Sequence, residues 1–445
     1  MITPKPKVYG RSDRASRQHR ISRRVRAVVA ATLSVGLAAA ALAGCAGGAS
    51  SGTSGGASSG TSGMNGKTVK MFTWVGNPDE EAQWTAYIDG GKLEDPALSV
   101  EFSGPAIGSY YTKLPTQLKG SDAPCIITLQ NGQLEPYASA LEPLDSYMTK
   151  AGIKASDYDP SMITQLSNGG KVYALPYDAE PMVLFYNKSM FAAAGVPAPT
   201  VHWTTNDFVT AAKKTTKGNV YGFALGQGIG PVGNFLAAND EEYVSKDGKA
   251  DLTSPALQKR LQWFINLATV EKVSRPLEAS GGQFPDIDQF SNSQAAMLIN
   301  GTWDMAHEAK AIGANNLGVA VIPSDNGTPH GSIAGTGFAM TKSCGDKAAA
   351  FNAISAMTSA KSQQAVAKSR SQVPARADSL DAWKSSTGAE PAAVVKILTE
   401  NGRVGVSATN GDKINTLFTQ YEVNGFSGKS TAAQILQNVR AGAGQ

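Results

Sequence analysis

The chain has 445 residues, 42% of them hydrophobic and 17% charged, which is typical of a globular protein with more than one domain. Nine of its 40 Lys and Arg residues and one of its 36 acidic residues precede Cys45, so the remainder carries a net charge of −4, against +4 overall. Because nucleic-acid binding depends on cationic neutralisation of phosphates, this balance excludes a nucleic-acid-binding protein.

The first 44 residues have the pattern of a secretory signal. A basic stretch precedes the Ala-rich run AVVAATLSVGLAAAALA at 27–43, which falls short of the roughly 20 strongly apolar residues of a spanning helix. The following LAGC, at 42–45, resembles the lipobox of bacterial lipoproteins. That resemblance implies a lipidated Cys45 as the first mature residue and attachment to the membrane by the lipid alone. The pair Arg23 and Arg24 leaves general and twin-Arg export both open.

A Gly/Ser-rich segment follows at 45–66, in which GGASSGTSG occurs twice. Such a composition cannot bury apolar surface and is typical of a flexible linker. We therefore expect a lipidated tether that holds the folded part near a membrane without embedding it.

The folded part opens with alternating strand and helix patterns. Residues 67–75 and 98–104 are rich in β-branched and aromatic residues and predict strands, and 124–130 predicts a third. Between them we expect a helix from about Glu80 and a helix interrupted at Pro115. This alternation is typical of α/β layers with parallel strands, whose carboxyl ends bind ligands. Those ends carry Trp74 and the pair Gln130 and Asn131.

The segment 171–216 has two adjacent extended runs split at Pro176, followed by a helix, a Pro-rich turn and a capped helix from about Thr205. A change from one extended run to another through a Pro-containing segment is what a crossing between two lobes would look like.

Three stretches carry a family resemblance: VYALPYD with LFYNKSMFAAAGVPAPT, then AAMLINGTW, then GTGFAMTKSCGDKAAAFNAI. In this order they resemble the extracellular solute-binding proteins of bacterial ABC importers, in the carbohydrate group that includes maltose-binding proteins. The likeness runs from about residue 67 to the C-terminus.

The resemblance implies an α/β, two-lobed, periplasmic-binding-protein-like fold with discontinuous lobes joined by a hinge. Carried onto this chain, lobe one would be 67–177 and 284–332, and lobe two 178–283 and 333–445. Cys125 and Cys344 would then lie in different lobes, where a disulfide would oppose hinge closure, so we expect none. Cys125 stands where the family usually has Asp, and its position indicates a small buried residue at a strand start.

The resemblance also implies a function: a monomeric protein that binds a carbohydrate between its lobes and delivers it to ABC permease subunits. It implies neither catalysis nor a cofactor nor a metal. Trp303 matches the family's stacking Trp, and Glu180 and Asp178 match acidic positions at the crossing that would accept sugar hydroxyls.

Other ligand-binding candidates have structural alternatives. Trp74 could face the cleft or the core, and Asn77 and Asp79 could accept hydroxyls or cap a helix. Tyr111, Trp203 and Trp263 are expected in packing. The weaker ligand-binding candidates, each as compatible with a structural role, are Tyr110, Asn131, Tyr177, Phe284, Thr336 and Arg376.

Several other functions stay open. A polyamine or a sugar phosphate would also suit a two-lobed binder, and a cell-surface glycosidase is the alternative from another class, with carboxylates such as Asp286 and Asp288. GIGPVG at 228–233 spells a dinucleotide fingerprint, but a lone pattern of this kind is weak. The histidines after Cys45 are widely spaced and predict no metal site.

Overall fold

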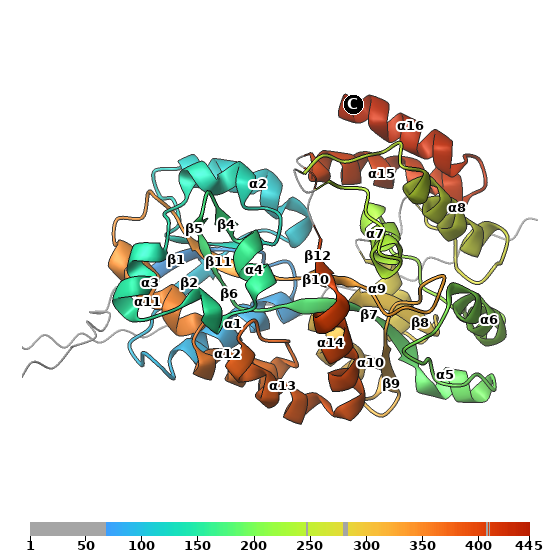
Figure 1. Cartoon of the computed structure of the whole chain (residues 1–445), viewed down its shortest axis with the longest axis horizontal. Helices are drawn as coiled ribbons and strands as arrows, with labels where there is room; N and C mark the ends of the chain where they lie inside the picture. The colour runs from blue at the N-terminus through green and yellow to red at the C-terminus, as the bar shows by residue number, and fades with distance from the viewer. Residues whose placement is uncertain (1–67, 246–247, 279–283, 406–407, 409) are drawn as a thin grey trace, which may run out of the picture. The chain divides into compact units, whose positions relative to one another are not determined.

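The computed structural model describes residues 68–445 except 246–247, 279–283, 406–407 and 409. The predicted signal, the tether and the lipidation site Cys45 lie outside the described residues. Within them the chain forms two sheet-containing α/β lobes (Figure 1), which confirms the expected fold class. None of the described helices is both long and apolar enough to cross a membrane.

Lobe one is built on a sheet with strand order β2-β1-β3-β11-β6. The first three strands of this order are parallel, as predicted, whereas β11 is antiparallel to both β3 and β6. The strands are β1 (Val69–Phe72), β2 (Val100–Ser103), β3 (Ile126–Gln130), β6 (Ala174–Pro176) and β11 (Thr336–Met340), with a separate hairpin of β4 (Ser167–Asn168) and β5 (Lys171–Val172).

Helices from two distant parts of the sequence cover this sheet. In Figure 1 the orange α11 and α12 lie among the blue and cyan elements of lobe one. The helices are α1 (Pro78–Gly91), α2 (Ile107–Lys119), α3 (Asp145–Ala151), α4 (Pro160–Gln165), α11 (Lys347–Met357) and α12 (Ala360–Arg370), with short 3₁₀ turns η1 (Glu135–Ala140) and η2 (Ala155–Asp157).

Helix α2 runs through Pro115 without a break, so the predicted interruption is wrong. Proline lacks the N–H that would bond the carbonyl four residues earlier, here that of Tyr111. The hydroxyl of Tyr137, on η1, donates to that carbonyl at 3.2 Å. A partner from outside the helix therefore satisfies the group that Pro115 leaves open.

Lobe two is built on a second sheet centred on β7, which pairs with β8, β9 and β10, while β12 pairs with β10. Alternate β7 residues face opposite apolar cores, Leu184 toward one and Val183 toward the other. The strands are β7 (Glu180–Asn187), β8 (Met297–Gly301), β9 (Leu317–Ala320), β10 (Ser332–Ala334) and β12 (Arg403–Val404).

The helices of lobe two divide between these cores. Those packed on the Leu184 side are α6 (Thr205–Thr215), α7 (Ile229–Ala238), α8 (Pro255–Thr269), α15 (Gly411–Phe426) and α16 (Ala432–Ala443). Those on the Val183 side are α9 (Pro285–Ser291), α10 (Met305–Ile312), α13 (Leu380–Thr387) and α14 (Ala389–Asn401). Helix α5 (Lys188–Ala193) follows β7. The short 3₁₀ turns are η3 (Thr302–Asp304) and η4 (Ala377–Ser379).

The segment assignment expected from the resemblance is wrong in two places. Residues 284–332, expected in lobe one, contain β8 and β9, which pair with β7 of lobe two. Part of 333–445 lies in lobe one, because β11 is bonded to β3 and α11 packs on that sheet. The chain crosses after β6, at Gly335 and again after α12.

The absence of a disulfide, expected from the same assignment, is also wrong. Cys125 and Cys344 are bonded. Cys125 immediately precedes β3 and Cys344 closely follows β11, and these two strands are antiparallel neighbours in lobe one. The bond therefore lies within one lobe and does not oppose movement between lobes.

We predict that reducing this disulfide lowers the melting temperature. The bond spans 219 residues, and removing a constraint of this kind costs roughly 2–5 kcal/mol of stability, because the unfolded chain gains freedom. Calorimetry with and without dithiothreitol measures the effect. A variant carrying Cys125→Ser and Cys344→Ser is the control and should not respond to the reductant. An equal melting temperature with and without reductant in the parent would contradict the prediction.

Candidate functional site

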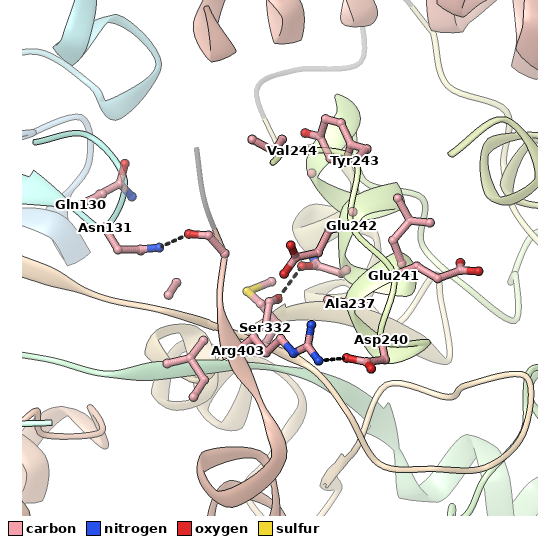
Figure 2. Close-up of a pocket in the computed structure, with 18 of the residues that line it drawn as sticks. Gln130, Asn131, Ala237, Asp240, Glu241, Glu242, Tyr243, Val244, Ser332 and Arg403 are labelled. Carbon is pink, nitrogen blue, oxygen red and sulfur yellow. Dashed lines mark hydrogen bonds and ion pairs between the residues drawn. The ribbon is translucent and has the colours of Figure 1, made fainter. Parts of the chain in front are cut away.

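A cavity of about 320 Å³ lies between the end of β3 in lobe one and α7 in lobe two. Figure 2 shows the side chains that line it from both sides. Asn131 Nδ2 donates to the carbonyl of Gly405 at 3.1 Å, and Ser332 Oγ donates to Asn234 Oδ1 at 3.0 Å. The floor is apolar, with Met182 from β7 and Ile333 from β10.

A second cavity of about 640 Å³ is adjacent to the first, because Gln133 lines both. Its walls come from the turn after β3, which carries Tyr137, and from the start of α15, which carries Asp412. We call the two cavities together the interlobe groove. Each cavity is within the size range of ordinary small-molecule sites.

Trp303 is not among the residues lining either cavity, but its ring lies on the face of the second sheet that carries Met182, a lining residue of the first cavity. Strand β8 ends at Gly301, which pairs with Met182, and paired residues share a face of a sheet. A Cβ on Gly301 would lie 2.0 Å from the Trp303 ring, so only glycine lets the indole cover the strand end there. The indole is 41% exposed, although large apolar side chains are usually buried.

Acidic side chains gather beside Trp303. Burial raises the pKa of Asp286 to about 6 and that of Glu308 to about 8, and it also raises the pKa of Asp304. Ser291 Oγ donates to Glu308 at 2.9 Å, and Asn300 Nδ2 donates to Asp304 at 2.9 Å. Among the residues that the structure describes, no group of His, Cys, Asp and Glu is suited to hold a metal ion.

Three further candidates from the sequence are exposed: Asn77, Asp79 and Phe284. Asn77 caps α1, because its side chain accepts from Glu80 N at 2.9 Å. Asp79 faces His307 Nδ1 across the lobes at 3.2 Å, and its backbone carbonyl accepts from Arg370. Phe284, directly before α9, is 44% exposed.

Three aromatic candidates are in the core of lobe one. Trp74 packs edge-on against Trp84 and Tyr110, and Tyr177 packs against Tyr87. Trp74 is 7% exposed and the two tyrosines at most 1%, so their surface is used in packing. The cleft alternative for Trp74 is therefore disfavoured. Tyr111 and Trp203 are buried and Trp263 packs against the core of lobe two, which confirms their predicted packing.

Asp178, Glu180 and Thr336 lie where the chain crosses between the lobes, and all three are buried. Asp178 accepts from Thr336 N at 2.6 Å and from Gln372 Nε2 at 3.3 Å. Glu180 accepts from Val373 N at 2.9 Å and from the hydroxyl of Thr302. Protein groups therefore occupy both carboxylates, in place of the sugar hydroxyls expected from the sequence.

Arg376 also lies away from the groove. Its guanidinium forms an ion pair with Asp378 and stacks over the ring of Tyr158, and it is not among the residues lining either cavity. The arginine that does line the groove is Arg403, which is paired with Asp240 (Figure 2).

Much of the groove lining was missed by the sequence analysis. A signal was present in Asp240 to Tyr243, a cluster of acids and an aromatic directly after the apolar helix α7. Other missed residues carry amides, a hydroxyl, a thioether or a guanidinium in unremarkable contexts: Gln133, Met182, Asn234, Ser332 and Arg403.

The first backbone N–H groups of the GIGPVG stretch already have hydrogen-bond partners within the chain. Glycine at 228 has a φ of 86° and precedes α7, and its N–H donates to the buried carboxylate of Glu422 at 3.0 Å. Ile229 N donates to Asn415 at 3.2 Å. With these first amides taken by α15, a dinucleotide phosphate has no place at this helix start.

Comparisons with known proteins agree with this architecture. Residues 76–364 match the family described as "Bacterial extracellular solute-binding protein". A 243-residue stretch is 25% identical to a binding protein of Brucella abortus (strain 2308), covering 52% of this chain and 57% of that protein. A 215-residue stretch is 27% identical to the sn-glycerol-3-phosphate-binding periplasmic protein UgpB of Escherichia coli (strain K12), covering 46% and 49%. The matches thus span about half the length of these relatives.

Solved structures match nearly their whole length. The ABC substrate-binding protein Lmo0181 from Listeria monocytogenes, in complex with cycloalternan, aligns with a TM-score of 0.76 at 24% identity, covering 84% of this chain and 97% of that chain. The maltose-bound MalE3 of T. maritima aligns with a TM-score of 0.70 at 19% identity, covering 85% and 99%. At these identities the likeness shows a shared fold.

We predict that the buried side chain of Asp178 makes folding stability depend on pH. Burial raises its pKa to about 8 in the folded protein, whereas the unfolded chain ionises near the ordinary value of 3.8. The folded state therefore holds the proton more tightly, and stability falls as the pH rises from about 4 to about 8.

Asp178→Asn removes the titrating proton. The asparagine keeps an acceptor for Thr336 N. Its amide can also donate to Gln372 Oε1, which has no partner among the described residues. The parent loses stability as the pH rises and the variant does not. We therefore expect the stability of the variant, relative to the parent, to be a few kcal/mol higher at pH 8 than at pH 5. Urea unfolding at both pH values measures this difference. A stability difference that does not change with pH would show that Asp178 is ionised in the fold.

Proposed function

Because the chain belongs to the family of bacterial extracellular solute-binding proteins, we propose that it captures a saccharide in the interlobe groove and delivers it to the membrane subunits of an ABC importer. The observation that carries this proposal is a cavity whose lining includes several amides, with the exposed indole of Trp303 on the face of the second sheet that carries its lining residue Met182.

Sugars present faces of C–H groups and rims of hydroxyls, and the groove offers a counterpart for each. The flat ring of Trp303 suits a C–H face, since aromatic surfaces bind apolar area in a defined orientation. Gln130, Asn131 and Asn234 suit hydroxyls, because an amide both donates and accepts hydrogen bonds.

A phosphorylated sugar is the second candidate, because one relative is named for sn-glycerol 3-phosphate. The charges of the groove argue against it. The first cavity is lined by Asp240, Glu241 and Glu242 against Arg403, which is already paired with Asp240. A phosphate there would meet net negative charge. A polyamine suits these acids better, but it would not use the neutral amides.

The proposed mechanism is hinge closure. Three crossing segments join the lobes, and a ligand that contacts both walls of the groove binds the closed arrangement better than an open one. Closure would bury the saccharide between Trp303 and the amides, and the importer's separate subunits would hydrolyse ATP. The protein would act as a monomer without a cofactor.

A melting-temperature screen of the purified protein tests the ligand class. Mono- and oligosaccharides, polyamines and sugar phosphates are compared, since a ligand specific to the folded state adds ~2.7 kcal/mol at a hundredfold excess over its Kd. A shift with one saccharide group supports the proposal, and a shift with only polyamines or phosphates overturns it. Chromatography of the incubated sugars separates a binder, which leaves them intact, from a glycosidase.

We predict that Trp303→Ala weakens saccharide binding by tenfold or more, about 1.4 kcal/mol, and changes stability by less than about 1 kcal/mol. The ring is partly exposed, so its loss opens no cavity in the core. Isothermal titration and urea unfolding measure the two effects. Leu93→Ala is the control, because Leu93 is 56% exposed just beyond the C-terminus of α1, the opposite end from Asn77. Equal losses of binding and stability would return Trp303 to a packing role.

Lipid anchoring at Cys45 is part of the proposal. Cys45→Ser removes the thiol that the lipid would modify, and we expect the variant to leave the membrane fraction and appear in the soluble extracellular fraction. Fractionation followed by immunoblotting measures the change. Retention of the variant in the membrane fraction would contradict an anchor at this position.

A further inference from the structure

Glu180 is buried at the first crossing between the lobes, next to the turn that carries Trp303. It is the first residue of β7, pairs with Ala334 of β10 and is 1% exposed. One carboxylate oxygen accepts from Val373 N, in the third crossing segment, at 2.9 Å. The other accepts from the hydroxyl of Thr302. A single side chain therefore links three segments that are distant in the sequence.

Thr302 is the residue directly before Trp303. It is fully buried and begins the short turn η3, so its hydroxyl bond fixes the backbone from which the indole projects. On the other side of Trp303, Asp304 is held by Asn300 Nδ2 at 2.9 Å. The exposed indole is thus bracketed by two anchored neighbours.

Stability alone gives no reason for a carboxylate at this position. Within the described part of the chain, no Lys, Arg or His forms an ion pair with Glu180, and the acid that interacts with it, Asp178, makes its ionisation harder still. Burying a carboxylate without a cation costs several kcal/mol, and an apolar residue of similar size often serves stability better.

We propose that Glu180 is a positioning residue that acts through Thr302 to hold the indole of Trp303 over Gly301, and that it ties this indole to the third crossing segment. Because Glu180 is 1% exposed, this role does not require it to contact the ligand. A change in hinge angle that moves Val373 relative to β7 is then transmitted to the indole. As a device for ligand binding, this inference rests on the proposed saccharide function.

The first test needs no ligand. All six Trp residues are described, and Trp303 is the exposed one, so acrylamide quenching of fluorescence reports mainly on it. The difference between the parent and Trp303→Phe isolates its emission. Thr302→Val removes the hydroxyl at nearly constant volume, and Thr302→Ser keeps it. We expect stronger quenching and red-shifted Trp303 emission in Thr302→Val, and parent-like values in Thr302→Ser.

The same comparison is made at residue 180. Glu180→Gln keeps an acceptor for Val373 N, and its amide can donate to the hydroxyl of Thr302, so Trp303 emission should stay as in the parent. Glu180→Ala should change the emission as Thr302→Val does. Unchanged Trp303 emission in Thr302→Val overturns the proposal, even if Glu180→Ala does not fold.

The second test measures saccharide affinity for the same variants. We expect Thr302→Val to raise the Kd about tenfold and Thr302→Ser to leave it within twofold of the parent. If Trp303 emission responds as expected but no saccharide binds the parent, the proposed function fails and the positioning role stands. If a saccharide binds the parent and Thr302→Val alters neither emission nor Kd, the positioning role fails and the function stands.

Discussion

The structure depends on how two buried carboxylates are satisfied where the lobes meet. Asp178 lies between β6 and β7, and Glu180 begins β7. The two accept hydrogen bonds from Thr336, Gln372, Val373 and Thr302. These donors belong to the second crossing, to the third crossing and to the turn after β8. An unsatisfied buried carboxylate is expensive, so these segments are held together wherever the pair stays buried. The crossing is therefore a network of bonds to two side chains as well as a bundle of adjacent strands.

This constraint also places the candidate site. Strand β7 starts at Glu180 and forms the centre of the second sheet, so the residues immediately after Glu180 lie next to the hinge. Met182 lines the first cavity, and its partner Gly301 carries the Trp303 ring. The groove is consequently assembled next to the hinge, between walls that belong to different lobes.

The local elements were predictable because their signals are local. The alternating pattern of residues 67–130 gave the strands β1 to β3, and Thr204 caps α6 as the sequence indicated. The break expected at Pro115 is absent because a distant hydroxyl, that of Tyr137, replaces the missing bond. The segment assignment and the Cys125–Cys344 pairing depended on which sheet each strand joins. A short apolar run such as MLING is compatible with either sheet, and its own sequence does not decide between them.

The candidate site was predictable only where a residue stands out by itself. Trp303 is conspicuous, because a large aromatic after a strand-ending Gly has few reasons to stay exposed. Trp74 and Tyr110 are equally conspicuous, but they pack against each other across two elements, and Trp74 also packs against Trp84 of α1, so these contacts place them in the core. The amides of the groove are the opposite case. Gln130, Asn131 and Asn234 line one cavity only because β3 and α7 face each other. The buried carboxylates of the crossing hold together the segments that bring these two elements close.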